Sequence, residues 1–159
     1  MSARLADPYR DLTVIDSRAP RFNQATIGIL SLVAVVTGWH EWLLGLLALQ
    51  LVVGLTIGRR WCLPCFAYFE LVQPRFGEGP LEDSRPPRIA NMAGAVVLAA
   101  STFAYALGSS AVGTGLALLV AALALVAATT GFCTGCEAYK LACRLTGRPF
   151  VSCPIPGQR

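Results

Sequence analysis

Charged residues are scarce in this sequence. Asp, Glu, Lys and Arg make up 14% of its 159 residues, whereas 55% are hydrophobic and the mean hydropathy is +0.58. In an ordinary soluble domain about a quarter of the residues are charged. The composition therefore excludes the usual soluble globular class and places the chain in a membrane.

Histidine is almost absent as well, because His40 is the only one. It lies next to Glu41 and between Trp39 and Trp42. Tryptophan is enriched where a membrane meets water. We therefore interpret this stretch as a polar turn between two interfacial anchors rather than as a proton-handling site.

Four stretches contain no charged residue at all, namely 25–38, 42–58, 89–108 and 111–132. An α-helix rises about 1.5 Å per residue and the hydrocarbon core of a bilayer is roughly 30 Å thick. We therefore predict an all-α polytopic membrane protein whose four transmembrane helices occupy about 22–39, 41–58, 89–108 and 111–132.

These helices define the predicted organisation of the chain. A tail covers 1–20, the transmembrane domain covers 21–147 with a loop at 59–88, and a second tail covers 148–159. Short amphipathic helices are expected along the membrane surface after the second and fourth spans. Alanines spaced by three and four in the fourth span are expected to form a close packing surface between helices, namely Ala117, Ala121, Ala124 and Ala128.

Positive charge is missing from two of the connections. All 13 Lys and Arg residues lie before the first span, in the central loop or after the fourth span, and none lies near His40 or in 109–114. Positive residues that flank membrane helices stay in the cytoplasm. The chain is therefore predicted to be a multi-pass protein of the cell inner (plasma) membrane with both termini and the central loop in the cytoplasm. The net charge of +4 reflects this topology, so we expect the lipid bilayer as a partner and no nucleic acid.

A cysteine motif occurs twice. Cys62-Leu63-Pro64-Cys65-Phe66-Ala67-Tyr68 follows the second span, and Cys133-Thr134-Gly135-Cys136-Glu137-Ala138-Tyr139 follows the fourth. The chain thus consists of two tandem hairpin repeats that start and finish on the same side of the membrane. A parallel repeat has its pseudo-twofold axis along the membrane normal. We therefore predict that the two CxxC pairs converge at the cytoplasmic end of the bundle.

The end of the fourth span carries a family resemblance. Gly131-Phe132-Cys133-Thr134-Gly135-Cys136, together with Arg21-Phe22-Asn23-Gln24 and the stretch before the third span, resembles the small bacterial membrane proteins called domain of unknown function 4395. The resemblance covers about 21–147. It implies a short multi-span bacterial membrane protein with thiols at its central motif, and it supplies no reaction.

The favoured hypothesis is thiol–disulfide redox chemistry or sulfur relay. A cytoplasmic position makes a static disulfide framework unexpected and favours redox, catalytic or metal-binding thiols. Cys62 precedes a helix start and follows two bases, Arg59 and Arg60, which would stabilise an attacking thiolate, with Cys65 as the resolving thiol. Cys133 and Cys136 would form the second redox pair, with Lys140 stabilising a thiolate there. This hypothesis requires no cofactor, and its partner would be a cytoplasmic thioredoxin-like or sulfurtransferase protein.

Two alternatives stay open. Cys62, Cys65, Cys133 and Cys136 could together ligate zinc or an iron–sulfur cluster. They could also be compact apolar side chains that pack helix ends in a structural or transport protein. Cys143 and Cys153 lie outside the repeated motif and carry less weight.

The predicted orientation can be tested by labelling intact cells with a membrane-impermeant thiol reagent. None of the six native cysteines should react from outside, because all follow spans that end in the cytoplasm. Cysteines introduced by Ser109→Cys or Gly113→Cys should react. Labelling of Cys62 or Cys136 from outside would reverse the orientation.

Overall fold

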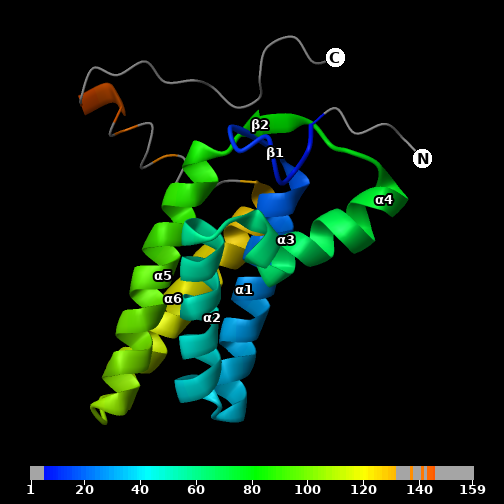
Figure 1. The fold of residues 1–159 in the computed structure, drawn as a ribbon. Coiled ribbons are helices and arrows are strands. Elements are labelled where there is room, and N and C mark those ends of the chain that lie inside the picture. The colour runs from blue at the N-terminus through cyan, green and yellow to red at the C-terminus, as the bar shows by residue number, and fades with distance from the viewer. Residues whose placement is uncertain (1–5, 132–136, 138–140, 142, 146–159) are drawn as a thin grey trace.

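The protein is a bundle of long helices. At one end lies a small cap, formed by residues 6–17 and 57–84. The computed structural model describes residues 6–131, 137, 141 and 143–145. The bundle comprises α1 (Arg18–Thr37), α2 (His40–Thr56), α5 (Arg85–Ala106) and α6 (Ser110–Thr130). Figure 1 shows α1 and α2 as one hairpin beside a second hairpin of α5 and α6. The prediction of a mostly helical chain is confirmed.

Each hairpin turns at a glycine in the left-handed region. Gly38 ends α1 with φ 78°, and Gly108 lies between α5 and α6 with φ 79°. A residue without Cβ adopts this conformation at no steric cost. Near the second turn, Ser109 is exposed, but a Cβ on Gly113 would lie 2.6 Å from Cδ2 of Tyr105. Ser109 is therefore the better position for the introduced cysteine.

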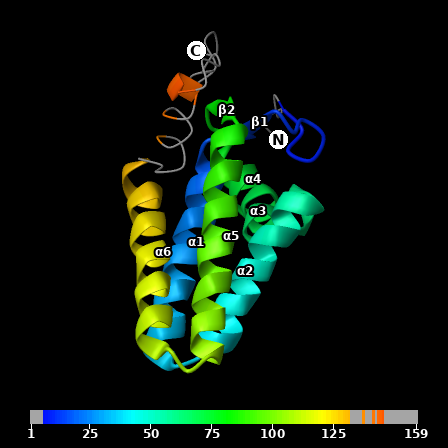
Figure 2. The same ribbon diagram turned by 90° about the vertical axis from the view of Figure 1, so that its left-hand side faces the viewer.

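The two hairpins pack against each other through small residues. The main helix contacts are α1 with α6, α2 with α5, and α5 with α6, as Figure 2 shows from the side. A Cβ on Gly28 of α1 would lie 2.7 Å from Cγ of Leu125 and 3.2 Å from the carbonyl oxygen of Ala121. Ala117, Ala121 and Ala124 are buried, as the alanine spacing predicts, whereas Ala128 is half-buried.

Three of the described helices, α1, α5 and α6, are long and apolar enough to cross a membrane. The helix α2 is also apolar but has 17 residues, or about 26 Å at the usual rise. Large apolar side chains are exposed around the bundle, including Ile29, Val33, Leu46, Leu49, Val96, Phe103, Leu118 and Leu123. Exposure of such a surface to water would be unfavourable, whereas exposure to the acyl chains of a bilayer is expected for a membrane protein.

Two helices begin earlier than predicted. The sequence predicts starts at about 22 and 89, whereas α1 starts at Arg18 and α5 at Arg85. In the sequence, Pro20 suggests that the N-terminal tail continues to this residue, and Pro86 and Pro87 suggest that the central loop continues to theirs. However, proline fits the first helical turn, where a backbone N–H has no helical partner.

A two-stranded sheet joins the segments before α1 and α5. β1 (Val14–Asp16) pairs antiparallel with β2 (Leu81–Asp83), with Ile15 opposite Glu82. The sequence analysis predicts tail and loop here and no strand. Each strand has three residues, which is too short for an alternating pattern to show, and the pairing depends on residues far apart in the chain. Seven Arg residues belong to elements at this end of the bundle, namely Arg18 and Arg21 at the start of α1, Arg59 and Arg60 after α2, Arg75 before β2, and Arg85 and Arg88 at the start of α5.

The predicted surface helix after α2 is present as a run of short elements. It comprises η1 (Arg59–Trp61), α3 (Leu63–Ala67), η2 (Tyr68–Val72) and α4 (Gln73–Phe76). Pro74 does not end this run as predicted, because the backbone widens to a π-turn in η2, where the Gln73 N–H donates to the Tyr68 carbonyl. A π-turn accommodates a proline ring that would otherwise clash with the carbonyl four residues earlier. The predicted surface helix after the fourth span lies largely outside the described residues.

Candidate functional site

The first CxxC motif forms a disulfide at the start of α3. Cys62 is the N-cap residue of α3 and has an extended backbone (φ −80°, ψ 104°), and Cys65 lies in the first turn. This geometry brings their Cα atoms within 5.2 Å, and their sulfurs are bonded. A disulfide needs Cα atoms roughly 4.4–6.8 Å apart. The CxxC pair that the sequence selects is therefore brought together by the helix start.

The disulfide is buried under the N-terminal segment. Cys62 is 4% exposed and Cys65 is 9% exposed, and both belong to an apolar cluster with Ala19, Tyr68 and Phe69. The helix α2 packs directly against Cys62, since a Cβ on Gly54 of α2 would lie 3.1 Å from Cβ of Cys62. A large molecule at the protein surface therefore has little access to either sulfur.

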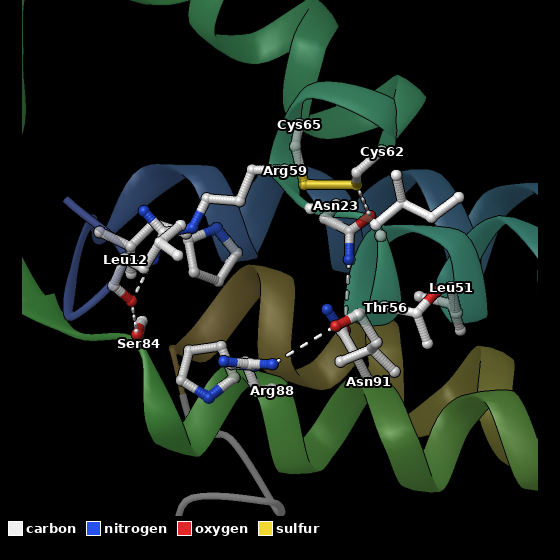
Figure 3. A pocket seen from close by; sticks show the side chains of 17 residues that line it. Leu12, Asn23, Leu51, Thr56, Arg59, Cys62, Cys65, Ser84, Arg88 and Asn91 are labelled. Atoms are coloured by element: carbon white, nitrogen blue, oxygen red, sulfur yellow. Dashed lines mark hydrogen bonds between the residues drawn. A yellow bond between two sulfur atoms is a disulfide. The ribbon is translucent and has the colours of Figure 1, made fainter. Parts of the chain in front are cut away.

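Cys62 and Cys65 line a cavity of about 190 Å³, whose lining also includes the exposed residues Thr56 and Ile57. Its polar lining comes from α1, α5 and the segment after α2, and Figure 3 shows Asn23 beside the disulfide and Asn91 and Arg88 across the cavity from it. Leu12, Leu51 and Leu55 supply apolar walls. The cavity thus combines a disulfide with side chains that donate hydrogen bonds.

Two asparagines from corresponding hairpins meet in this cavity. Asn23 is 2% exposed, and its Nδ2 donates to Oδ1 of Asn91 at 3.3 Å. Gln24 donates to the same oxygen at 3.4 Å. The Oδ1 of Asn23 lies 4.0 Å from Sγ of Cys62, so it is placed to accept a hydrogen bond from that thiol in the reduced protein. Sequence reasoning missed this role, although the two residues lie in the first turns of the two predicted hairpins.

Arg59 lines the cavity but is largely engaged with the backbone. Its guanidinium donates to the carbonyl oxygens of four residues in the N-terminal segment, Pro8, Asp11, Leu12 and Val14, at 2.8–3.2 Å. Burial, and then the charge of Arg88, lower the pKa of Arg59, while Asp11 raises it. Because an arginine pKa starts above about 12, the group stays charged. Arg59 therefore holds the N-terminal segment over the cavity and contributes positive charge to it.

The other predicted cation, Arg60, is exposed and does not line the cavity. Its place is taken by Arg88, which the sequence analysis assigns only to membrane topology. Arg88 lines the cavity and donates to the carbonyl oxygen of Leu55 at 3.3 Å. Its position in the first turn of α5 brings it opposite Arg59, which the sequence cannot show.

The buried carboxylate of Asp16 anchors the helix run that carries Cys65. Its Oδ2 accepts hydrogen bonds from Tyr68 Oη at 3.0 Å, Gln73 Nε2 at 3.1 Å and the Gly79 N–H at 3.0 Å. Its Oδ1 accepts from the Arg18 N–H at 2.9 Å. Burial, and then the charge of Asp16, raise the pKa of Tyr68 far above its usual value, so the phenol stays protonated and keeps donating.

Most of the remaining predicted site residues lie outside the part of the chain that the structure describes. Cys133, Cys136, Lys140 and Cys153 lie outside the described residues. Cys143 is buried and unbonded. Within the described part of the chain, no group of three or more His, Cys, Asp or Glu side chains could hold a metal ion. Two of the four thiols of the alternative metal site fall outside that part.

Comparison with known proteins gives one finding. A family model described as Domain of unknown function (DUF4395) matches residues 15–144. Neither a curated protein nor a solved structure matches the chain.

The role of Asp16 can be tested with Asp16→Ala. The substitution leaves the donors of Tyr68 and Gln73 unpaired in a buried place, and each such donor costs about 1–3 kcal/mol. We expect a loss of about 3 kcal/mol in unfolding free energy, measured by near-ultraviolet circular dichroism in detergent.

The matched control is Asp11→Ala, because the side chain of Asp11 is exposed and accepts from the Asp7 N–H. Its cost should stay below about 1 kcal/mol. Equal losses in the two variants would contradict the anchoring role.

Proposed function

The chain belongs to the family described as Domain of unknown function (DUF4395), whose description assigns no reaction, so we propose from its own residues that it is a membrane-bound thiol–disulfide redox protein. Cys62 and Cys65 cycle between dithiol and disulfide. The observation that supports this most directly is the Cys62–Cys65 disulfide facing a cavity lined by two arginines.

Cys62 is the attacking thiol in this proposal. It precedes the helical run 63–76, whose N-terminal N–H groups favour negative charge, and Arg59 and Arg88 line the same cavity. Attack by the Cys62 thiolate on a disulfide between Cys133 and Cys136 forms a mixed disulfide and releases the thiolate of the other cysteine of that pair. The Cys65 thiolate then attacks the Cys62 sulfur, forms the internal disulfide and releases the second thiolate, so two electrons pass to the second pair, and the exchange runs in both directions.

The same thiolate suits sulfur relay. It would accept a sulfane sulfur as a persulfide and pass it on without net oxidation. The pairing of Cys62 with Cys65 favours the redox cycle, because a relay needs only one thiol.

We place this centre at the cytoplasmic face of the bacterial inner membrane. All four bundle helices would span the bilayer as two parallel repeats, with the arginine-rich end inside. The packing of α1 on α6 and of α2 on α5 supports the repeat, because a twofold that exchanges the hairpins also exchanges these two contacts.

The second pair, Cys133 and Cys136, is proposed to relay electrons between the buried disulfide and a protein partner. Gly131 ends α6, and a Cβ there would meet the guanidinium of Arg21, two residues from Asn23. The chain thus reaches the start of α1 just before the second motif. Because Cys62 and Cys65 are buried, a thioredoxin-like or sulfurtransferase partner would exchange with the second pair.

Thiol titre and metal content of the anaerobically purified protein test the proposal against the four-thiol metal site. We expect little metal and a reversible change of at least two thiols between the oxidised and reduced protein. Cys62→Ser should abolish the part of the change that belongs to this pair, because Cys65 then has no partner within its motif.

The control is Cys143→Ser, which removes a buried, unbonded thiol. It should lower both titres by one and leave their difference intact. Stoichiometric zinc or iron, with four protected thiols and unfolding on chelation, would replace the redox proposal by the metal site.

Convergence of the two motifs can be tested by mild oxidation of isolated membranes, followed by proteolysis in the 77–88 segment. A bond between the pairs requires Cα atoms within about 7 Å. We expect fragments that stay linked until reduction, and no link in the double variant Cys133→Ser, Cys136→Ser. Links confined to each motif under all conditions would rule out a direct relay.

A further inference from the structure

A second, apolar cavity lies beside the cavity at the disulfide. It has a volume of about 270 Å³ and lies among α1, α5 and α6. Leu51 and Asn91 line both cavities, so the two are neighbours that share these side chains as a wall.

The two cavities have opposite chemistry. The first holds the disulfide and the donors of Asn23, Asn91 and Arg88, whereas the second is lined mainly by Ala, Leu, Val and Ile side chains. Among the described residues no Asp or Glu lines either cavity. The combined site therefore fits an amphiphile with a compact, oxygen-bearing head at the sulfurs and an apolar tail.

The apolar cavity also reaches the outer surface of the bundle. Ile89, Leu119 and Leu123 line it and are 36%, 50% and 42% exposed. In a bilayer this surface faces the acyl chains, so a lipid-soluble molecule can enter from the side. A water-soluble protein, in contrast, meets sulfurs that are at least nine-tenths buried.

We propose that this site binds an isoprenoid-type quinone, which is the electron acceptor of the Cys62–Cys65 dithiol. The proposal rests on the redox function above and names its oxidant. A phospholipid has the same division into head and tail, but its head cannot accept electrons. The disulfide lines the more polar of the two cavities, so the head group that enters it is one that can accept electrons from the dithiol.

The reaction balances as two thiols and a quinone giving a disulfide and a quinol. The Cys62 thiolate forms a bond from its sulfur to a ring carbon of the quinone. The Cys65 thiolate then attacks the Cys62 sulfur, the new sulfur–sulfur bond forms, and the sulfur–carbon bond breaks with its electron pair going to the ring. The two thiol protons end on the two ring oxygens, and two electrons have moved.

Asn91 and Arg88 are the donors that would bind a ring oxygen of the quinone. Oδ1 of Asn91 is occupied by Asn23 and Gln24, which leaves its amide N–H groups as donors. The guanidinium of Arg88 donates one hydrogen bond to Leu55 and carries a positive charge at the cavity wall. Both groups stabilise negative charge that develops on the ring oxygen during reduction.

The test is the rate at which ubiquinone-1 oxidises the reduced full-length protein in anaerobic liposomes, followed by quinol formation and thiol loss. Cys62→Ser supplies the background rate. Gly94→Leu fills the apolar cavity, because Gly94 lines it and a Cβ there would point to Cδ1 of Leu51 at 3.5 Å. We expect this variant to lower the rate about tenfold or more while oxidation by diamide, a small water-soluble oxidant, stays at the wild-type rate.

Gly115→Leu is the matched control, because a Cβ on Gly115 meets no atom within 4 Å. It should oxidise at the wild-type rate with both reagents. Wild-type protein that reacts with diamide but not with ubiquinone-1, or Gly94→Leu protein that reacts with ubiquinone-1 as fast as wild type, would overturn the quinone site and leave the redox function standing. If no oxidant converts the dithiol reversibly, both proposals fail.

Discussion

The hydrogen bonds of two charged side chains, one buried and one half-buried, hold the site together. The buried Asp16 carboxylate ties β1 to Tyr68 and Gln73, and the half-buried Arg59 guanidinium ties the segment 8–14 to the end of α2. A charge taken out of water is costly unless its hydrogen-bonding capacity is satisfied. Because Asp16 and Arg59 reach these partners only when the N-terminal segment lies over the disulfide, the same hydrogen bonds fix that segment and the helix run that carries Cys62 and Cys65.

Burial decides what kind of chemistry the disulfide can take part in. Cys62 and Cys65 are buried beneath the N-terminal segment, and they line a cavity together with Asn23 and Asn91. Such a site favours exchange with small molecules or with a second thiol pair of the same chain.

Some of the site was predictable, and the reasons are local. CxxC spacing at a helix start is a short-range property, so the pairing of Cys62 with Cys65 follows from seven residues of sequence. The sequence places Asn23 only in the first turn of a predicted span, Arg88 in the topology signal and Asp16 in the tail. Their roles depend on contacts across 39 positions for Asn23 with Cys62, 33 for Arg88 with Leu55 and 57 for Asp16 with Gln73. The second motif and its Lys140 lie outside the described residues, so its convergence with the first remains a prediction.

The sequence by itself determined the apolar helices, their hairpin turns at glycine and the residues of the first thiol pair, because hydrophobic runs, φ restrictions and CxxC spacing act within a few residues. Tertiary structure decided which cation faces the sulfurs and placed the two asparagines side by side. It also paired 14–16 with 81–83 and opened a cavity between polar cap and apolar bundle. These features depend on packing between segments that are distant in the chain, and no local pattern in the sequence encodes that packing.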